Sequence, residues 1–217
     1  MAGLGNGDVP VVSASKGENA LMSYLGRLNY NYDSKYYVTF SMRADGSSKF
    51  APGNRWGYFP SVSAGWTISE EKFMESVKSW FDFLKIRVSW GQVGNANINC
   101  YQYLAPVSTT NTNYNFGSGG GQDAWVTGSY TSRLANEKVK WETSEQYNVS
   151  IDARFLNGRL SLTADGYIKN TKDCLVQAPV LATAGTSGPI INGGDVKNQG
   201  VELGLSWNDQ IGKDFTY

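Results

Sequence analysis

The sequence predicts an all-β chain whose antiparallel strands form part of the wall of a large transmembrane β-barrel. Three observations support this prediction. Apolar and polar residues alternate strictly in segments of about ten residues, which is longer than the usual strand of a soluble protein. Long and short connections alternate along the chain, and aromatic residues gather at both ends of the segments. Together these features are typical of a sheet that has lipid on one side and water on the other.

Four alternating segments occupy the first half of the chain. They cover residues 24–32, 36–44, 58–68 and 84–91. In each segment one set of alternate positions is mainly apolar and the other mainly polar, as a half-buried antiparallel strand requires. Pro60 has no backbone N–H to donate, so we expect it at the start of its strand or at a bulge.

Three further segments follow in the second half, at residues 141–155, 160–169 and 201–208. The apolar positions that we assign to the lipid side in these segments include Val149, Ile151, Leu162, Leu203 and Leu205. Residues 1–20 show no such pattern and are expected to form an irregular N-terminal segment or loop. Residues 21–217 are therefore expected to form the partial barrel, without a plug domain.

The connections between these segments are of two kinds. Short turns are expected at residues 32–36, 156–159 and 208–214, and a short amphipathic helix is expected within residues 69–83, around 70–80. Long loops are expected at residues 45–57, 95–138 and 173–199. In an antiparallel sheet this alternation places all long loops at one end, as in outer-membrane barrels.

Aromatic residues mark both ends of the predicted strands. At the short-turn end these are Tyr30, Tyr32, Tyr36, Tyr37, Trp66, Trp80, Phe81 and Phe83; at the long-loop end they are Trp56, Tyr58, Trp90 and Trp141. Two such belts are what amphipathic rings at two water–lipid boundaries require.

A soluble alternative remains open at this stage. Alternation with a period of two fits any half-buried antiparallel sheet, including a secreted or periplasmic β-sandwich that binds carbohydrate. The two readings differ in solubility, because a wall segment has an exposed apolar face and unpaired edges.

Composition argues against several functional classes. Nineteen basic and nineteen acidic residues balance, so no electrostatic attraction to nucleic acid is expected. Histidine is absent, and Cys100 and Cys174 cannot form a zinc site, although a disulfide between them stays possible. We expect neither a cofactor nor a metal. No apolar run is long enough for a transmembrane helix, and the start lacks a signal peptide, so we expect an internal fragment of a longer chain.

No catalytic constellation is recognisable, and we expect no enzymatic activity. Glu142 and Asp152 are ten residues apart on one strand, roughly 33 Å, so they cannot flank one bond. We interpret Glu142, Glu145 and Asp152 as solvated charges on the luminal face. The stretch "SGGGQ" lacks the Lys-Ser/Thr of a phosphate-binding loop.

One loop suits contact with a substrate. In "TNTNYNFGSGGGQDAWVTGSY" aromatic rings are interspersed with amide and hydroxyl side chains, which suits stacking on sugars. The candidate contact residues are Tyr114, Phe116, Trp125 and Tyr130. The competing interpretation is a surface loop that packs on itself.

Several blocks resemble one family. "YDSKYYVTFSMRADGSSKF", "NRWGYFPSVSAGWTISEEKFM", "LKIRVSWGQVGN", "WETSEQYNVSIDARFLNGRLSLTADGYIKNTKD" and "NQGVELGLSW" are similar, in this order, to the SusC/RagA branch of TonB-dependent outer-membrane transporters. The resemblance covers nearly the whole chain from about Leu21. Cys174 departs from it, because related sequences tend to carry an aliphatic residue there.

The resemblance implies a barrel of about 22 strands around a plug. It implies import of glycans or peptides across the outer membrane of a Bacteroidetes-like bacterium, with energy delivered through TonB. The implied partners are membrane lipid, the rest of the barrel and plug, a SusD-like surface lipoprotein, TonB, and an oligosaccharide or peptide. No residue for contact with the plug or TonB can be assigned on this chain.

Overall fold

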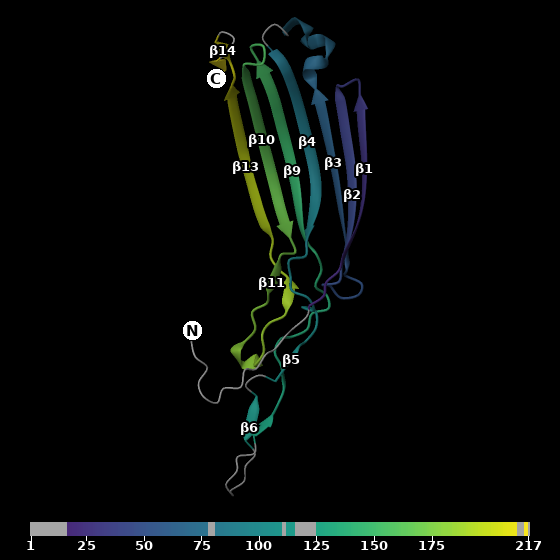
Figure 1. Ribbon diagram of the computed structural model, residues 1–217, viewed down its shortest axis with the longest axis vertical. Helices are drawn as coiled ribbons and strands as arrows, with labels where there is room; N and C mark the ends of the chain where they lie inside the picture. The colour runs from purple at the N-terminus through teal and green to yellow at the C-terminus, as the bar shows by residue number, and fades with distance from the viewer. Residues whose placement is uncertain (1–16, 78–80, 110–111, 116–124, 212–214, 217) are drawn as a thin grey trace.

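A single curved sheet of seven long strands makes up most of the computed structural model (Figure 1). The structure describes residues 17–77, 81–109, 112–115, 125–211 and 215–216. Every neighbouring pair of strands is antiparallel, and the order in the sheet, β1-β2-β3-β4-β9-β10-β13, follows the order in the chain. The strands are β1 (Leu21–Tyr32), β2 (Tyr36–Ser47), β3 (Trp56–Thr67), β4 (Phe81–Asn95), β9 (Glu142–Phe155), β10 (Leu160–Lys172) and β13 (Val196–Trp207).

All seven predicted strands are confirmed, and each contains 12 to 15 residues. This length suits a strand that crosses a bilayer at a tilt. The expectation that Pro60 lies at the start of its strand or at a bulge is wrong, because Pro60 lies inside β3 in unbroken register opposite Met42. It lies beyond the last residue pair that β3 forms with β4. The missing N–H of Pro60 therefore falls where the pairing on that side has already ended.

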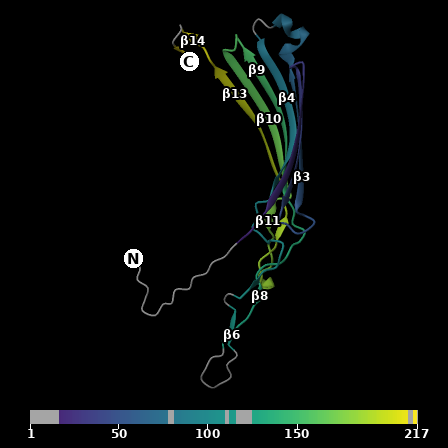
Figure 2. The same cartoon turned by 45° about the vertical axis from the view of Figure 1, so that its right-hand side comes forward.

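The expected segregation of the connections is confirmed. The short turns after β1 and β9 and the link from β3 to β4 lie at one end of the sheet, the upper end in Figure 1. The loops of residues 48–55, 96–141 and 173–195 lie at the other end. Figure 2, with the sheet seen closer to its edge, shows these loops continuing beyond the lower end of the strands.

The tight turns depend on left-handed backbone. Asp33 and Ser34 have φ of 51° and 53°, and Leu156 and Asn157 have φ of 59° and 57°. Gly158 follows with φ of 79°, where a glycine carries no steric cost. Such turns match the right-handed twist of the flanking strands.

The expected short helix is present as two consecutive 3₁₀ helices, η1 (Ile68–Glu70) and η2 (Lys72–Val77). The second 3₁₀ helix ends at Val77, residues 78–80 lie outside the described part of the chain, and β4 begins at Phe81. Phe81 packs edge-on against Phe155 of β9, with 4.5 Å between ring centroids, and this contact favours the strand over a further helical turn. No helix among the described residues is both long and apolar enough to span a bilayer.

Small hairpins occupy the long loops. These are β5 (Val107–Ser108) with β8 (Tyr130–Thr131), β6 (Asn113–Asn115) with β7 (Trp125–Thr127), and β11 (Leu175–Gln177) with β12 (Ile190–Asn192). A third 3₁₀ helix, η3 (Ala182–Ala184), lies between β11 and β12. Beyond β13, β14 (Gln210–Ile211) lies within the predicted terminal turn and pairs with β15 (Phe215–Thr216), which follows it. Residues 17–20 have no regular structure, and residues 1–16 lie outside the described part of the chain.

Candidate functional site

The seven-stranded sheet has one continuous apolar face, which we call the apolar face; the other is the polar face. Strand register brings apolar positions of neighbouring strands side by side, because a shift of one residue would turn a side chain to the other face. One row across the sheet consists of Tyr30, Val38, Ala64, Val88, Val149, Gly166 and Val201.

The apolar face is open rather than covered. On the inner strands β4 and β9, Val88, Val149 and Ile151 are 46%, 54% and 40% exposed. An exposed apolar patch of this extent marks contact with another protein or with a membrane. The sandwich alternative therefore finds no support, since a sandwich would bury this face against a second sheet.

Aromatic residues bound this face at both ends with a constant spacing. Tyr24 and Tyr32 on β1, Tyr58 and Trp66 on β3, and Tyr147 and Phe155 on β9 are each eight residues apart. Eight residues correspond to about 27 Å along a strand. Rings stack between strands within each belt: Tyr24 on Trp56 at 5.9 Å and Tyr36 on Trp66 at 6.4 Å.

The belts are oblique to the rows of paired residues. Tyr147 shares a row with Leu28 of β1, which is four residues from Tyr24 toward the short-turn end. Between β1 and β3 there is no offset, because Tyr58 shares a row with Tyr24 and Trp66 shares a row with Tyr32. The offset of four residues, about 14 Å, develops between β3 and β9. The opposite belt shows the same offset, since Phe155 is four residues beyond Ile151, which shares a row with Tyr32.

At the short-turn end a carboxylate ties the belt to the link between β3 and β4. The Tyr36 hydroxyl donates to Glu71 Oε1 at 2.6 Å, and the Trp66 indole donates to the same oxygen at 3.2 Å. These two donors hold the pKa of Glu71 below its ordinary value. The hydroxyl of Tyr36 and the indole N–H of Trp66 are thus held in place by Glu71, which lies outside the strands.

One expectation for the carboxylates is wrong. Glu145 lies on the apolar face with Trp90 and Tyr147, not on the luminal face, because it has the same odd parity as Tyr147. It accepts hydrogen bonds from the Trp90 indole at 2.9 Å and the Tyr147 hydroxyl at 3.0 Å, and Lys172 pairs with it at 2.9 Å. An ion pair with this many donors satisfies a carboxylate that is only 9% exposed.

The polar face carries short hydroxyl and amide side chains together with paired charges, among them Arg43 with Asp45 at 2.7 Å and a network around Arg87. Arg87 of β4 forms two hydrogen bonds to Asp152 of β9, at 2.8 and 3.2 Å. Asp165 of β10 accepts from Ser150 and lies 4.0 Å from Arg87. Asp152 is thus a paired charge on the polar face as expected, and Glu142, at the other end of β9, is bonded to Asn95 and Leu175.

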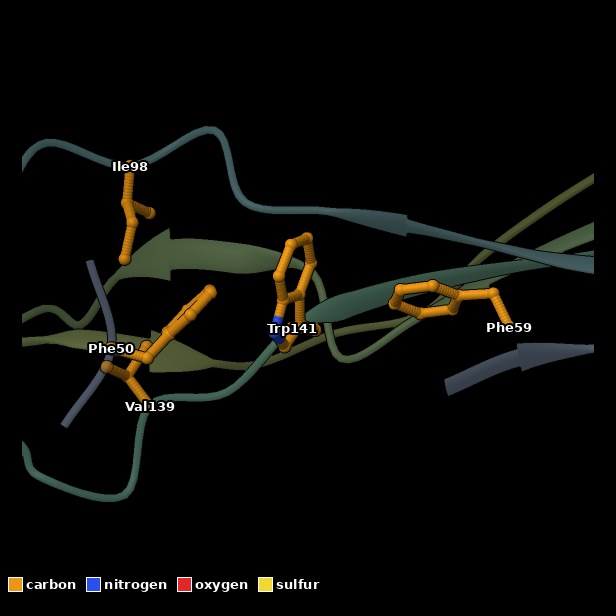
Figure 3. Packing of buried hydrophobic residues seen from close by; sticks show 5 residues of the cluster. All are labelled: Phe50, Phe59, Ile98, Val139 and Trp141. Carbon is orange, nitrogen blue, oxygen red and sulfur yellow. The ribbon is translucent and has the colours of Figure 1, made fainter. Parts of the chain in front are cut away.

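A small hydrophobic core lies at the long-loop end rather than in the middle of the sheet. It consists of Phe50, Phe59, Ile98, Val139 and Trp141 (Figure 3). The ring of Phe59 lies against Gly94 of β4, where any side chain would collide with it. We call this core and the loops around it the loop cluster.

The assignment of Trp141 to an aromatic belt is wrong. Trp141 is 8% exposed, packs on Phe50 and Phe59 with ring centroids 5.3 and 5.6 Å away, and donates its indole N–H to the Arg55 carbonyl at 2.9 Å. β9 begins one residue later, so Trp141 is free to turn into the loop cluster. Trp80 lies outside the described residues, and Tyr37 faces Lys85 on the polar face.

Asparagine side chains hold the loop cluster together. Asn192 Nδ2 donates to the carbonyls of Lys140 and Asp173 at 2.9 and 3.0 Å, and its Oδ1 accepts from Lys140 N–H at 2.9 Å. Asn54 and Asn136 bridge to the carbonyls of Glu137 and Ile190. Each amide satisfies backbone groups of a different loop, so the three long loops act as one unit.

The predicted contact residues lie on the hairpins that extend from this cluster. Tyr114 on β6 is 55% exposed, and its ring lies against Gly128; Tyr130 on β8 is 43% exposed. Trp125 begins β7, and its backbone pairs with Asn115. Phe116 lies outside the described residues. The assignment of these residues to substrate contact stays a prediction.

An amide-lined pocket of about 390 Å³ was not anticipated from the sequence. The pocket is lined by Asn97, Gln102, Gln177 and Arg133, and by Ile190, which also packs against the hydrophobic core. Arg133 is fixed by hydrogen bonds to the carbonyls of Tyr101 and Leu104, at 3.3 and 3.4 Å. The residues come from three separate segments, so no local pattern could reveal them. In the part of the chain that the structure describes, no cluster of acidic, histidine or cysteine residues is placed to hold a metal, and both cysteines are free thiols.

Comparison with protein families agrees with this geometry. The family model described as "TonB dependent receptor-like, beta-barrel" matches residues 3–217. Among curated proteins, TonB-dependent receptor SusC of Bacteroides thetaiotaomicron is 40% identical over 204 residues, 92% of this chain and 20% of that protein. TonB-dependent receptor P3 of Formosa agariphila is 35% identical over 203 residues, 92% of this chain and 19% of that protein. The chain thus spans about a fifth of these relatives.

Comparison with solved structures agrees with the family match. The RagAB peptide importer in its 'closed-closed' state matches with a TM-score of 0.78 and 32% identity, over 92% of this chain and 21% of that one. The siderophore receptor PirA from Pseudomonas aeruginosa matches with a TM-score of 0.56 and 15% identity, over 91% of this chain and 32% of that one, which supports the fold alone.

Proposed function

The chain belongs to the TonB dependent receptor-like, beta-barrel family, and from that premise we propose that it forms seven strands of the wall of an outer-membrane nutrient importer. The observation that carries the proposal is the open apolar face that is bounded at both ends by aromatic belts. The similarity of this chain to SusC and to the RagAB importer supports a role in import as part of a SusC/RagA-type transporter.

The wall performs no chemistry in this proposal. Its apolar face contacts the lipid of an outer membrane of the Bacteroidetes type, and its polar face lines the lumen. The short-turn end faces the periplasm and the loop cluster faces the outside, as the loop lengths of outer-membrane barrels indicate. A plug, TonB and a SusD-like surface lipoprotein are the partners of the complete protein in this proposal.

Site-directed spin labelling of the full-length protein in lipid vesicles tests the membrane assignment. Cys100 and Cys174 are replaced by serine, and single cysteines are then placed at positions 148 to 153 of β9. Labels at 149, 151 and 153 should be relaxed by dissolved oxygen, and labels at 148, 150 and 152 by a water-soluble nickel complex. A lack of alternation would contradict the proposal.

For the substrate we propose an oligosaccharide or a peptide that contacts the loop cluster. The exposed rings of Tyr114 and Tyr130 support stacking on sugar faces or apolar side chains. Phe116 and Trp125 belong to the same proposed contact on the sequence pattern alone. The amide-lined pocket supports hydrogen bonding to hydroxyl or peptide groups, because amides both donate and accept.

Substrate affinity of the full-length transporter tests this second part. Replacing Tyr114 and Trp125 together with alanine should weaken binding about two- to tenfold for each ring that contacts the substrate. Val126→Ala is the matched control, since Val126 pairs with Tyr114 and is 50% exposed. Unchanged affinity in the double variant would remove these rings from the site and leave the wall assignment intact.

A further inference from the structure

We propose that the apolar face holds one anionic, phosphate-bearing lipid in a groove along β9, β10 and β13, with the acyl chain in the groove and the phosphate at Lys197. The inference rests on the proposed function, because it requires the apolar face to lie in a membrane. It goes beyond general lipid contact, because it assigns one lipid chemistry to one place on the wall.

The groove is a depression of about 530 Å³ on the apolar face. Its sides are formed by Tyr147, Val149, Ile168 and Val201, and its floor is formed by Gly166. A Cβ at Gly166 would meet nothing closer than the Val149 carbonyl oxygen, 4.0 Å away. The space above Gly166 is therefore open, and a flexible hydrocarbon chain can fill it with apolar contact on three sides.

The side of the groove nearest the loop cluster is fixed in place. The hydroxyl of Tyr147 is held by Glu145, which also accepts from Trp90 and pairs with Lys172. The charge of Glu145 is thereby compensated within the protein. The carboxylate stabilises the Tyr147 ring as a groove wall and does not leave an uncompensated negative charge toward a lipid phosphate.

Lys197 supplies the positive charge for the headgroup. It is paired in register with Asn170 on β10 and shares the parity of Val201, so it lies on the apolar face. Gln199, the nearest groove residue on β13, is two residues away, about 7 Å toward the bilayer centre. Among the described residues no carboxylate forms an ion pair with Lys197, in contrast to Lys172.

A lipid with net negative charge fits these features together. The ammonium lies at the level where the apolar face changes to amide and charged side chains, in the row of Gln92, Glu145, Asn170 and Lys197. A phosphate there would be within reach of the lysine while its acyl chain extends along the groove. A zwitterionic lipid of the same chain length fills the groove but gains less from Lys197.

Native mass spectrometry of the delipidated full-length protein tests the inference. The protein in detergent is titrated with phosphatidylglycerol, with phosphatidylcholine of the same acyl chains, and with inorganic phosphate alone. We expect one phosphatidylglycerol bound about fivefold more tightly than phosphatidylcholine, and no adduct with inorganic phosphate.

Two variants and two matched controls locate the site. Lys197→Gln should remove the preference for phosphatidylglycerol, and Gly166→Leu should remove the bound lipid by filling the groove. Lys169→Gln changes a lysine on the polar face of β10, and Gly26→Leu changes a glycine on the apolar face of β1 with nothing within 4 Å; both should leave binding unchanged.

The same preparations separate failure of the inference from failure of the proposed function. Recovery of all five proteins in the outer-membrane fraction, with equal binding of both lipids or with no effect of Lys197→Gln and Gly166→Leu, would overturn the lipid site alone. An adduct with inorganic phosphate as abundant as that with lipid would also overturn it. Absence of the unaltered protein from the outer membrane would contradict the proposed function itself.

Discussion

The sheet and the loop cluster place their hydrophobic residues in opposite ways. In the regular part of the chain the large apolar side chains are outside: Leu203 is 76% exposed, and Leu28 is 69% exposed. In the irregular part they are inside, since Phe50 and Val139 are fully buried. A soluble monomeric protein rarely exposes a continuous apolar face of the first kind.

The difference is expected from the proposed function, in which two solvents, water and hydrocarbon, act on one chain. The loop cluster folds as a water-soluble domain does, by removing Phe and Trp rings from water and satisfying backbone groups with asparagine amides. The sheet obtains its order from ladder hydrogen bonds and cross-strand pairs, and its apolar side chains gain stability only from the surrounding hydrocarbon. A substitution in one region should therefore change the stability of that region and leave the other region unchanged.

The largest effect is expected in the loop cluster. Phe50→Ala removes a fully buried ring that packs on Trp141 and should destabilise the cluster by about 3–5 kcal/mol. Hydrogen exchange of the full-length protein should show lost protection in residues 48–55 and 139–141 and unchanged protection in β9 and β10. Loss of protection across the sheet would mean that the two regions are one cooperative unit.

A charge on the apolar face should have the next largest effect. Ile151 lies midway between the belt residues Tyr147 and Phe155, and Ile151→Arg should cost about 2–4 kcal/mol. Leu162→Arg, closer to the short-turn end, should cost less. Both are measured as loss of folded protein in the outer-membrane fraction.

Thr163→Arg is the matched control for these substitutions. Thr163 neighbours Leu162 on β10 but lies on the polar face opposite Asp152. It should assemble normally and gain a carboxylate neighbour. Equal loss of assembly for Leu162→Arg and Thr163→Arg would show that the two faces do not differ in solvent.

A smaller effect is expected from the amides between the loops. Asn192→Ala removes three hydrogen bonds to Lys140 and Asp173, and the groups left behind should cost about 1–3 kcal/mol. Faster exchange of the Lys140 amide is the measurement. Asn198→Ala is the control, because Asn198 lies on the polar face of β13 and its side chain has no hydrogen-bond partner among the described residues.

The smallest effect concerns Glu71 at the short-turn end. Because its pKa is lowered in the folded protein, the contacts with Tyr36 and Trp66 contribute stability above the ordinary carboxylate pKa, about 4.3, and this contribution is lost as the pH falls through the folded value. Glu71→Gln should abolish this dependence. Trp66 emission as a function of pH, in unaltered and variant protein, is the measurement; identical curves would contradict the assignment.

The sheet could be predicted from the sequence because its rule is local. Alternation with a period of two locates each strand, and the observed strands extend the predicted segments by only a few residues, as at Leu21 and Lys172. The same rule places Glu145 on the apolar face, although its charge suggests the polar one. Its partner Lys172 is 27 residues away, so the compensation becomes visible only when β9 and β10 are paired.

The loop cluster could not be predicted because its contacts are distant in sequence. The bond from Trp141 to the Arg55 carbonyl spans 86 residues, and nothing around Trp141 distinguishes a belt residue from a core residue. The amide-lined pocket likewise needs three segments brought together. The position of Tyr114 on an exposed hairpin agrees with the loop predicted for substrate contact, but exposure alone does not reveal what it contacts.

The constant spacing of the belts has a consequence for the surrounding bilayer. Eight residues at a tilt of about 35–40° span about 21 Å along the barrel axis, less than the hydrocarbon thickness of an average bilayer, about 30 Å. In the proposed function, lipids next to this wall would compress, at a cost that grows with each ångström of mismatch. The wall would therefore be matched to a membrane that is thinner than average, as the bacterial outer membrane is.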